Sequence, residues 1–544
     1  MSGPQSTFDY IIVGAGSAGS VLTNRLSEDR DAKILLLEAG RHDRSLLLSM
    51  PLGVAKVFRD PRYNWSYQSE PEHFLDGRRI EHSRGKTIGG SSAINAMAYV
   101  RGHRADYDRL PQLGLKGWSY ADVLPYFKRL ESYEAGENSY RGSDGPWHVR
   151  RGPYHFELFD AFREAGQHLG YPKNEDYNGA DQVGFAAHQH TIHRGRRWGN
   201  AAAFLHPALR RKNVRLETSA HVTRLLLEGD RVVGLEYSQG GRVLKAYAAR
   251  DVILAGGAFN SPHLLMLSGI GPAEKLKNVG IKPIVDLPGV GQNLWDHPMI
   301  TTVWSRIGES YIHRNLRYDR LARSILKGIF LRRGFACEHY SSGTAFVFSD
   351  KEHEIPDLQL FCRDGTIAMH EWFPLIRKPA PQAISINCAH LRPESRGEVD
   401  LISADPRRAP RIVNNFLSSE ADRRALRQGY KTMCDLARSP GLKELLAGAF
   451  WPSAQLEGDQ EIDSFIRSSM QTVYHPGGTC KIGTDSMSVV DIEFRVNGTQ
   501  GLRVIDASVL PLPIGGNINA AVTVFADKAS DLVRGLPGLS RAEI

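Results

Sequence analysis

The chain has 544 residues, of which 41% are hydrophobic and 24% are charged, so its composition is that of a globular protein and excludes a low-complexity one. This length exceeds what one core normally serves, and we expect two or more domains. The net charge of +8 comes from short basic clusters, such as residues 194–197 and 210–212, mixed with acids elsewhere. This favours a solvated surface, with steering of an anionic ligand as the alternative, and we expect no nucleic-acid partner.

The cysteines bear on the cellular compartment. Five are present: Cys337, Cys362, Cys388, Cys434 and Cys480. The odd number and the absence of a Cys-x-x-Cys pair argue against a zinc knuckle and a disulfide framework, as is typical of a reducing compartment. The start, MSGPQST, is short and polar. We therefore expect no secretory leader, no membrane span and a cytoplasmic location.

Residues 8–40, FDYIIVGAGSAGSVLTNRLSEDRDAKILLLEAG, contain the first motif. An apolar run at 10–13 predicts a buried strand, and glycines at G-x-G-x-x-G spacing then lead into a helical pattern. A second apolar run, 34–37, ends at Glu38. This predicts a βαβ dinucleotide site, in which the glycines admit a pyrophosphate and Glu38 binds ribose hydroxyls. The acid does not separate NAD from FAD, because the adenosine ribose of either cofactor suits a carboxylate.

Three later segments look like further parts of this nucleotide-binding unit. Residues 83–108 contain a second glycine-rich turn before a predicted helix near Ala93, which offers N–H groups to a diphosphate or a flavin ring, or is an ordinary loop. Residues 214–237 alternate like two strands with a turn at Asp230. Residues 250–272 predict a strand at 252–254 and a helix capped by Ser261-Pro262.

The middle of the chain, about 310–470, is irregular, aromatic and basic, with a helical patch at 419–437. We interpret it as a second domain inserted between the nucleotide-domain segments. The predicted organisation is one discontinuous nucleotide-binding domain at 1–155, 200–310 and 475–544, and one substrate-binding domain at 156–199 and 311–474.

Five segments, taken in order, resemble the glucose–methanol–choline (GMC) flavin oxidoreductases over residues 8–534. They are GKTIGGSSAIN (85–95), GAFNSPHLLMLSGIG (257–271), LPGVGQNLWDH (287–297), LRPESRGEV (391–399) and GLRVIDASVLP (501–511). The style is most similar to choline-dehydrogenase-like bacterial alcohol dehydrogenases. The resemblance implies an α/β fold, with a Rossmann-type FAD-binding domain and a substrate domain of a mostly antiparallel six-stranded sheet and helices.

The resemblance also implies which residues hold FAD. It places three glycines of the first motif at the diphosphate, Glu38 at the adenosine ribose and Val222 near the adenine. The full expected set is Gly14, Gly16, Ser17, Ala18, Gly19, Glu38, Ala39, Gly90, Asn95, Ala96, Met97, Val222, Asp506, Ala507 and Asn517. Ile94 stands where some members carry a histidine bonded covalently to the flavin, so we expect noncovalent FAD.

Flavin-dependent alcohol oxidation needs a base for the hydroxyl proton and a donor that orients the oxygen. Family members place the catalytic histidine in an H-P-x-G-T stretch and a second residue, His or Asn, 44 positions later. Here these positions are His475 and Asn519. Asn519 also opens a predicted helix and is alternatively an N-cap. Asn517 is the alternative partner if the register differs.

Other signals receive weaker interpretations. Cys480, beside Lys481, is predicted to be an inert thiol and not a nucleophile. His188, His190 and His193 imitate a metal cluster but lack an acidic or cysteine partner, so we expect no metal. The candidate cavity walls are Met97, Phe361 and Tyr474, with core packing as the alternative, and Glu338-His339 is a further candidate.

The predicted function is therefore FAD-dependent oxidation of a primary aryl or alkyl alcohol to the aldehyde, with hydride transfer to flavin N5 and His475 as base. The basic middle domain favours a neutral or acidic alcohol over choline, whose ammonium needs an anionic or aromatic cage. The alternatives are choline oxidation, a non-redox member such as a lyase or a light-driven decarboxylase, and a flavin-free NAD protein. The electron acceptor is oxygen, a quinone or another carrier.

Overall fold

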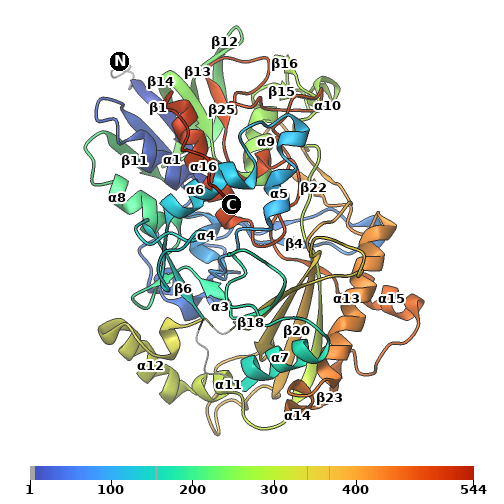
Figure 1. Cartoon of the computed structure of the whole chain (residues 1–544). Coiled ribbons are helices and arrows are strands. Elements are labelled where there is room, and N and C mark those ends of the chain that lie inside the picture. Colours follow the sequence, from blue (N-terminus) through green and yellow to red (C-terminus); the bar gives the residue numbers. More distant parts are fainter. Residues whose placement is uncertain (1–6, 153–156, 340, 367) are drawn as a thin grey trace.

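The computed structural model describes residues 7–152, 157–339, 341–366 and 368–544, so the predicted domain boundary at 155–156 lies outside the described residues. The molecule has two halves, each built around one sheet (Figure 1). The half drawn at the top contains both β1, the first strand of the described chain, and α16 (Asn519–Val533), its last helix. The other half contains most of the middle of the chain.

The first sheet is a parallel core with an antiparallel extension. Its strands are β11 (Val214–Thr218), β2 (Ile34–Glu38), β1 (Thr7–Val13), β14 (Arg242–Leu254), β13 (Arg231–Gln239) and β12 (His221–Glu228), in that order, with β25 (Leu502–Val504) also paired to β14. The apolar runs at 10–12 in β1 and 34–37 in β2 are buried on both faces, as is usual for parallel strands. Helices α1 (Ser17–Leu26) and α16 pack against each other on this sheet. The predicted strands and the turn at Asp230 are present.

One helix of this half begins earlier than predicted. Helix α9 (Gly257–Leu267) starts four residues before Ser261, because the Asp506 carboxylate accepts hydrogen bonds from Gly257 N at 2.8 Å and Ser261 Oγ at 2.6 Å. Pro262 thus lies inside the helix, where it cannot donate to the Ala258 carbonyl. The Thr479 hydroxyl donates to that carbonyl at 2.6 Å instead.

The second sheet is antiparallel at every strand pair. Its order is β23 (Leu446–Trp451), β17 (Pro298–Arg306), β20 (Ala383–His390), β19 (Leu358–Asp364), β18 (Ser341–Val347) and β7 (Gly184–Ala186), and β24 (Gln471–Thr472) also pairs with β17. The main path thus has the six predicted strands, and the short β24 is a seventh. Strand β17 falls in segment 200–310, which the sequence assigned to the other domain. Its residues extend the sheet by pairing with β20, a contact made across some 80 residues that no local pattern reveals.

Helices cover one face of this sheet and leave the other for the cavity. The covering helices are α7 (Glu157–His168), α13 (Glu420–Arg438) and α15 (Asp459–Ser469), whose buried residues share one core with those of the sheet. Leu360 and Cys362 of β19 are fully buried in the core beneath these helices. Phe361 and Arg363 alternate with them and line the cavity on the other face.

Candidate active site

A cavity of about 1020 Å³ connects the two halves. At one end it is lined by the carboxyl ends of the parallel strands, including Val13, Glu38 and Leu254. At the other end it is lined by second-sheet residues such as Met299 and Phe361. Ligands of open α/β sheets bind at this edge of the parallel strands, so the cavity lies where a nucleotide is expected.

Two glycine turns form a cradle in the first half. Gly14 has φ +105°, and a Cβ on it would lie 2.6 Å from the carbonyl oxygen of Ala255. Gly90 has φ +52°, and a Cβ there would lie 2.7 Å from Cα of Gly16. The turns thus meet through bare backbone, and side chains are excluded from both. Backbone N–H groups can then approach a diphosphate closely, so these residues fit the pyrophosphate of a dinucleotide.

The predicted ribose-binding acid lies beside this cradle. Glu38 is buried, and its carboxylate accepts hydrogen bonds from Ala15 N at 2.9 Å and Gly40 N at 2.7 Å. Burial raises the pKa of Glu38 to about 7, against the effect of these two bonds. Ala39 and Val222 line the cavity with it. The two backbone bonds orient the carboxylate and leave lone pairs for ribose hydroxyls.

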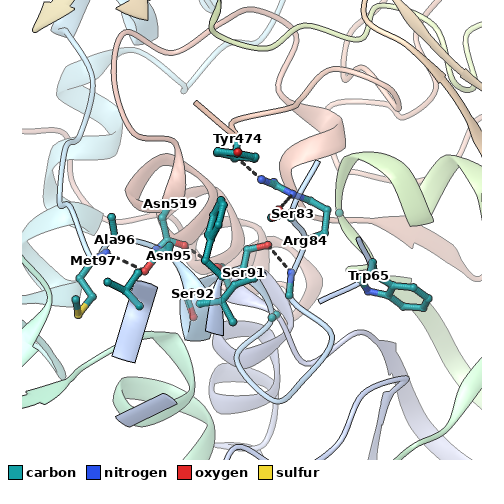
Figure 2. Close-up of a pocket in the computed structure, with 18 of the residues that line it drawn as sticks. Trp65, Ser83, Arg84, Ser91, Ser92, Asn95, Ala96, Met97, Tyr474 and Asn519 are labelled. Atoms are coloured by element: carbon teal, nitrogen blue, oxygen red, sulfur yellow. Dashed lines mark hydrogen bonds between the residues drawn. The ribbon is translucent and has the colours of Figure 1, made fainter. Parts of the chain in front are cut away.

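The residues predicted to lie along the flavin also line the cavity. They are Asn95, Ala96, Met97, Asp506 and Ala507, and Ile94 lies with them. Asn95 is held by the buried Arg197, whose guanidinium donates to its side-chain oxygen at 2.8 Å and to its carbonyl at 2.6 Å. The Asn95 side chain in turn accepts from Met97 N at 3.0 Å, a bond drawn in Figure 2. This short segment therefore has a fixed shape.

The backbone around His475 is held from three sides. Arg84 donates to the carbonyl oxygen of Tyr474 at 2.5 Å (Figure 2), and Tyr474 has φ +66°. His475 N donates to Asp296 Oδ1 at 2.8 Å. Beyond the histidine, Gly477 and Gly478 lie on the indole of Trp295, and a Cβ on Gly477 would be 2.4 Å from that ring. The Pro-Gly-Gly corner is thus required by contact with a buried tryptophan.

The hydrogen bonds of the His475 ring define its tautomer. The Asn517 amide nitrogen lies 3.2 Å from Nε2, and His297 Nδ1 lies 3.1 Å from Nδ1. An amide nitrogen only donates, so Nε2 of His475 accepts and the ring hydrogen is on Nδ1, which donates to His297. The amide is itself oriented by Gln359, which donates to the Asn517 oxygen at 3.5 Å. The basic lone pair therefore points toward Asn517.

The structure brings Asn517, and not Asn519, to His475. The Asn519 oxygen accepts from Ser17 Oγ at 2.6 Å, and its nitrogen donates to Asn200 at 3.1 Å. Asn519 is the first residue of α16, and Ile518 is the N-cap without a side-chain cap bond, so the N-cap alternative does not hold either. The predicted pairing at 44 residues is thus replaced by the alternative at 42, because the chain turns between the two asparagines.

Burial dominates the electrostatics of this cluster. Burial, together with the positive charge of Arg84, lowers the pKa of His475 to about 3. It raises the pKa of Asp296 to about 6 and lowers that of Arg84 to about 10. The pKa of His297 is held well below its usual range by burial and by His475. Both imidazoles are therefore neutral near pH 7.

Sequence reasoning missed several members of this cluster. Asp296 and His297 are the last two residues of the LPGVGQNLWDH segment, whose resemblance to the family implied no role for either of them. Arg84 and Gln359 carried no motif of their own. Phe361, Tyr474, Met97 and His339 line the cavity, whereas Glu338, the other residue of the predicted Glu338-His339 pair, is not among its lining residues. His188 also lines it and stacks on Phe361, with ring centroids 5.5 Å apart.

The rival signals lead to no second site. Cys480 is fully buried, and burial keeps the pKa of its thiol well above the usual range, so it is not a thiolate. His193 stacks on His148, with ring centroids 3.6 Å apart, and His190 neighbours His188 and His339. Within the described part of the chain, no three His, Cys, Asp or Glu side chains are arranged to hold a metal. In the same residues we find no helix with the length and apolar character needed to cross a bilayer.

A nucleotide cradle joined to a buried histidine–amide pair fits a nucleotide-dependent oxidoreductase. Family models described as GMC oxidoreductase match residues 8–299 and 393–526. The chain therefore belongs to the GMC oxidoreductase family, and its cofactor is FAD. This confirms the family, the fold class and the choice of FAD over NAD that the motifs predicted.

Relatives and solved structures agree with this family. The chain is 40% identical to the mitochondrial choline dehydrogenase of Homo sapiens, over 98% of this chain and 90% of that protein. It is 41% identical to the oxygen-dependent choline dehydrogenase of Sinorhizobium fredii, over 98% and 97%. The structure of pyridoxine 4-oxidase from Mesorbium loti has a TM-score of 0.87 at 30% identity, over 97% of this chain and 100% of that one.

Proposed function

We propose that the protein oxidises a primary aryl or alkyl alcohol to the aldehyde, with FAD as the hydride acceptor. The observation that supports this most is the contact between Nε2 of a neutral His475 and the Asn517 amide, within the cavity that continues to the glycine cradle. A base and a hydrogen-bond donor at one point are what removal of a hydroxyl proton requires.

We assign the cofactor contacts from the same cavity. The two glycine turns would hold the diphosphate, Glu38 the adenosine ribose and Val222 the adenine side. Asn95, Ala96, Met97, Asp506 and Ala507 would lie along the flavin and its ribityl chain. Bound FAD supplies the hydride acceptor for the alcohol carbon. Ile94 cannot form a covalent bond to the cofactor, so we propose noncovalent FAD, which acid precipitation releases into the supernatant.

The protein supplies the proton transfer. In the described structure the Asn517 amide occupies the Nε2 lone pair of His475. An alcohol hydroxyl takes that place, donating to Nε2 and accepting from the Asn517 amide. The hydroxyl proton then moves to Nε2 as the hydride leaves the carbon, so one proton and one hydride are removed and the aldehyde remains. His297 accepts the Nδ1–H of His475 throughout and keeps the ring oriented.

Choline oxidation is the second candidate, since choline dehydrogenases are 40–41% identical to this chain. Anaerobic stopped-flow absorbance of the holoprotein, mixed with a panel of alcohols that includes choline and benzyl alcohol, tests both. Bleaching of the oxidised flavin by an alcohol supports the proposal. No bleaching by any alcohol, or undiminished bleaching in His475→Ala, contradicts it. Reoxidation with air and with quinones then identifies the acceptor.

A further inference from the structure

Strand β19 forms a wall of the cavity whose side chains change along the strand from polar to aromatic to positively charged. On β19, Gln359, Phe361 and Arg363 share the face opposite the helices. Gln359 contacts the Asn517 amide, and so marks the end of the wall at the reacting hydroxyl. Arg363 lies four residues further on, about 13 Å along an extended strand. Phe361 lies between them, with the His188 ring stacked on it.

Arg363 brings a positive charge into this cavity. Its side chain is exposed yet lines the cavity, and surrounding protein lowers its pKa by desolvation. A side chain can be both exposed and desolvated only if its exposed surface faces the cavity and not the outside of the protein. Among the described residues, the Arg363 guanidinium has no hydrogen bond and no ion pair. A guanidinium remains protonated in proteins, so the charge is present.

The neighbouring groups do not neutralise this charge. The next residue, Asp364, also borders the cavity, but its carboxylate accepts from Ser310 at 2.9 Å and pairs with Arg306 at 3.3 Å. Glu371, at the cavity wall, is paired with Lys56 at 2.9 Å. Burial, with a contribution from the charge of Arg363, keeps the pKa values of His188 and His339 low, so these rings are neutral.

A cation enclosed by protein without a partner costs free energy, which an anionic ligand offsets through charge-assisted hydrogen bonds. An ammonium ligand would instead meet repulsion from the same guanidinium. The wall thus favours a ligand with a negative charge at Arg363 and a flat apolar body at Phe361.

We propose that the substrate is a hydroxy acid: a primary alcohol whose far end carries a carboxylate bound by Arg363 and whose body lies on Phe361. This inference rests on the proposed alcohol oxidation at His475 and specifies its substrate class. The hydroxyl lies at His475 and Asn517, and the carboxylate lies at the opposite end of the wall. The carboxylate takes no part in the redox step and leaves as part of the aldehyde product.

The first experiment compares three para-substituted benzyl alcohols of one shape with the wild-type holoprotein. They are 4-(hydroxymethyl)benzoate, benzyl alcohol and 4-(aminomethyl)benzyl alcohol, with 6-(hydroxymethyl)naphthalene-2-carboxylate as a longer acid. Stopped-flow flavin reduction gives the rate constant and the apparent Kd for each. We expect an acid to exceed benzyl alcohol in rate constant over Kd by about 10- to 100-fold, the usual contribution of a charged hydrogen bond, and the amine to be poorest.

The second experiment changes the charge. Arg363→Gln is expected to remove the advantage of the acid, a loss of about 10- to 100-fold, and to leave benzyl alcohol within about threefold. Arg363→Glu is expected to reverse the preference toward the amine. The matched control is Arg407→Gln, which removes the same charge from an exposed arginine paired with Asp405.

The outcomes separate this inference from the proposed function. If no alcohol reduces the flavin, the proposed function fails. If benzyl alcohol or choline reduces it and neither acid is preferred, only the hydroxy-acid inference fails. If Arg363→Gln loses the acid and the neutral alcohol equally, the residue is structural and the inference is also overturned. Should the variants not fold, the wild-type comparison decides alone.

Discussion

The two walls of the cavity are built in different ways. The nucleotide wall is made of backbone: the glycines of two turns meet with no room for a Cβ, and their sequence motifs are local. The opposite wall is made of alternate side chains on strands whose partners lie far away along the chain. Short sequence motifs are enough to specify the backbone shape of the first wall. The side chains of the second wall come together only through the pairing of distant strands. The first wall can therefore be predicted from short motifs, and the second only once the strand pairing is known.

The largest effect is expected where the walls meet, at His475. His475→Ala removes the proposed proton acceptor, and we expect flavin reduction by alcohol to slow by about 10²- to 10⁴-fold. Stopped-flow reduction measures it, and the visible flavin spectrum checks that FAD is still bound. His42→Ala, at an exposed position, is the control. A variant that keeps wild-type rates with bound FAD would remove His475 from the mechanism.

Substitutions of Asn517 and Asn519 are expected to distinguish the two walls most clearly. Asn517→Ala removes a donor at the alcohol oxygen, and we expect flavin reduction to slow by about 10²- to 10³-fold with FAD retained. Asn519→Ala breaks bonds to Ser17 and Asn200 within the nucleotide half. We expect it to lower the free energy of unfolding by about 1 kcal/mol and to change the reduction rate little.

Thermal unfolding and single-turnover reduction of both asparagine variants decide between the registers. A larger rate loss in Asn519→Ala than in Asn517→Ala would restore the spacing of 44 residues and contradict the observed contact.

The backbone wall is tested by adding one methyl group. Gly90→Ala places a Cβ 2.7 Å from Cα of Gly16 at φ +52°. We expect FAD binding to weaken by at least about tenfold, since strain at such a position costs on the order of 1–3 kcal/mol. Fluorescence of released FAD on dilution measures it. Gly136→Ala is the control, because Gly136 has φ +92° and open space around its Cβ position. Equal FAD loss in both variants would count against the cradle.

The smallest expected effect is that of pH on the chemical step. Burial lowers the pKa of His475 to about 3, so its ring is already neutral above that pH and does not gain basic form on further increase. We expect the limiting rate of flavin reduction to stay constant between about pH 5 and about pH 8. A rise in rate through pH 6.5 would mean that the histidine titrates as an exposed one does.

The sequence predicts the two walls of the cavity to different extents. The glycine turns, Glu38 and His475 line the cavity, and each could be predicted because its sequence signal lies within one short segment. The amide in contact with His475 lies two residues before the predicted one, since a spacing cannot say which of two nearby amides the chain turns inward. Helix α9 began earlier than predicted because its cap, Asp506, comes from a distant segment. β17 and Arg363 depended on strand pairing, which short segments do not specify.

The indole of Trp295 beneath Gly477 and Gly478 has a consequence for anyone redesigning this enzyme. The histidine takes its place from a ring that no reactant touches, so the corner behind it tolerates almost no variation. Strand β19 has no such glycine corner on its cavity face, where the side chains of Phe361 and Arg363 line the cavity. Libraries aimed at new substrates belong on that strand, and the glycine corner is best left untouched.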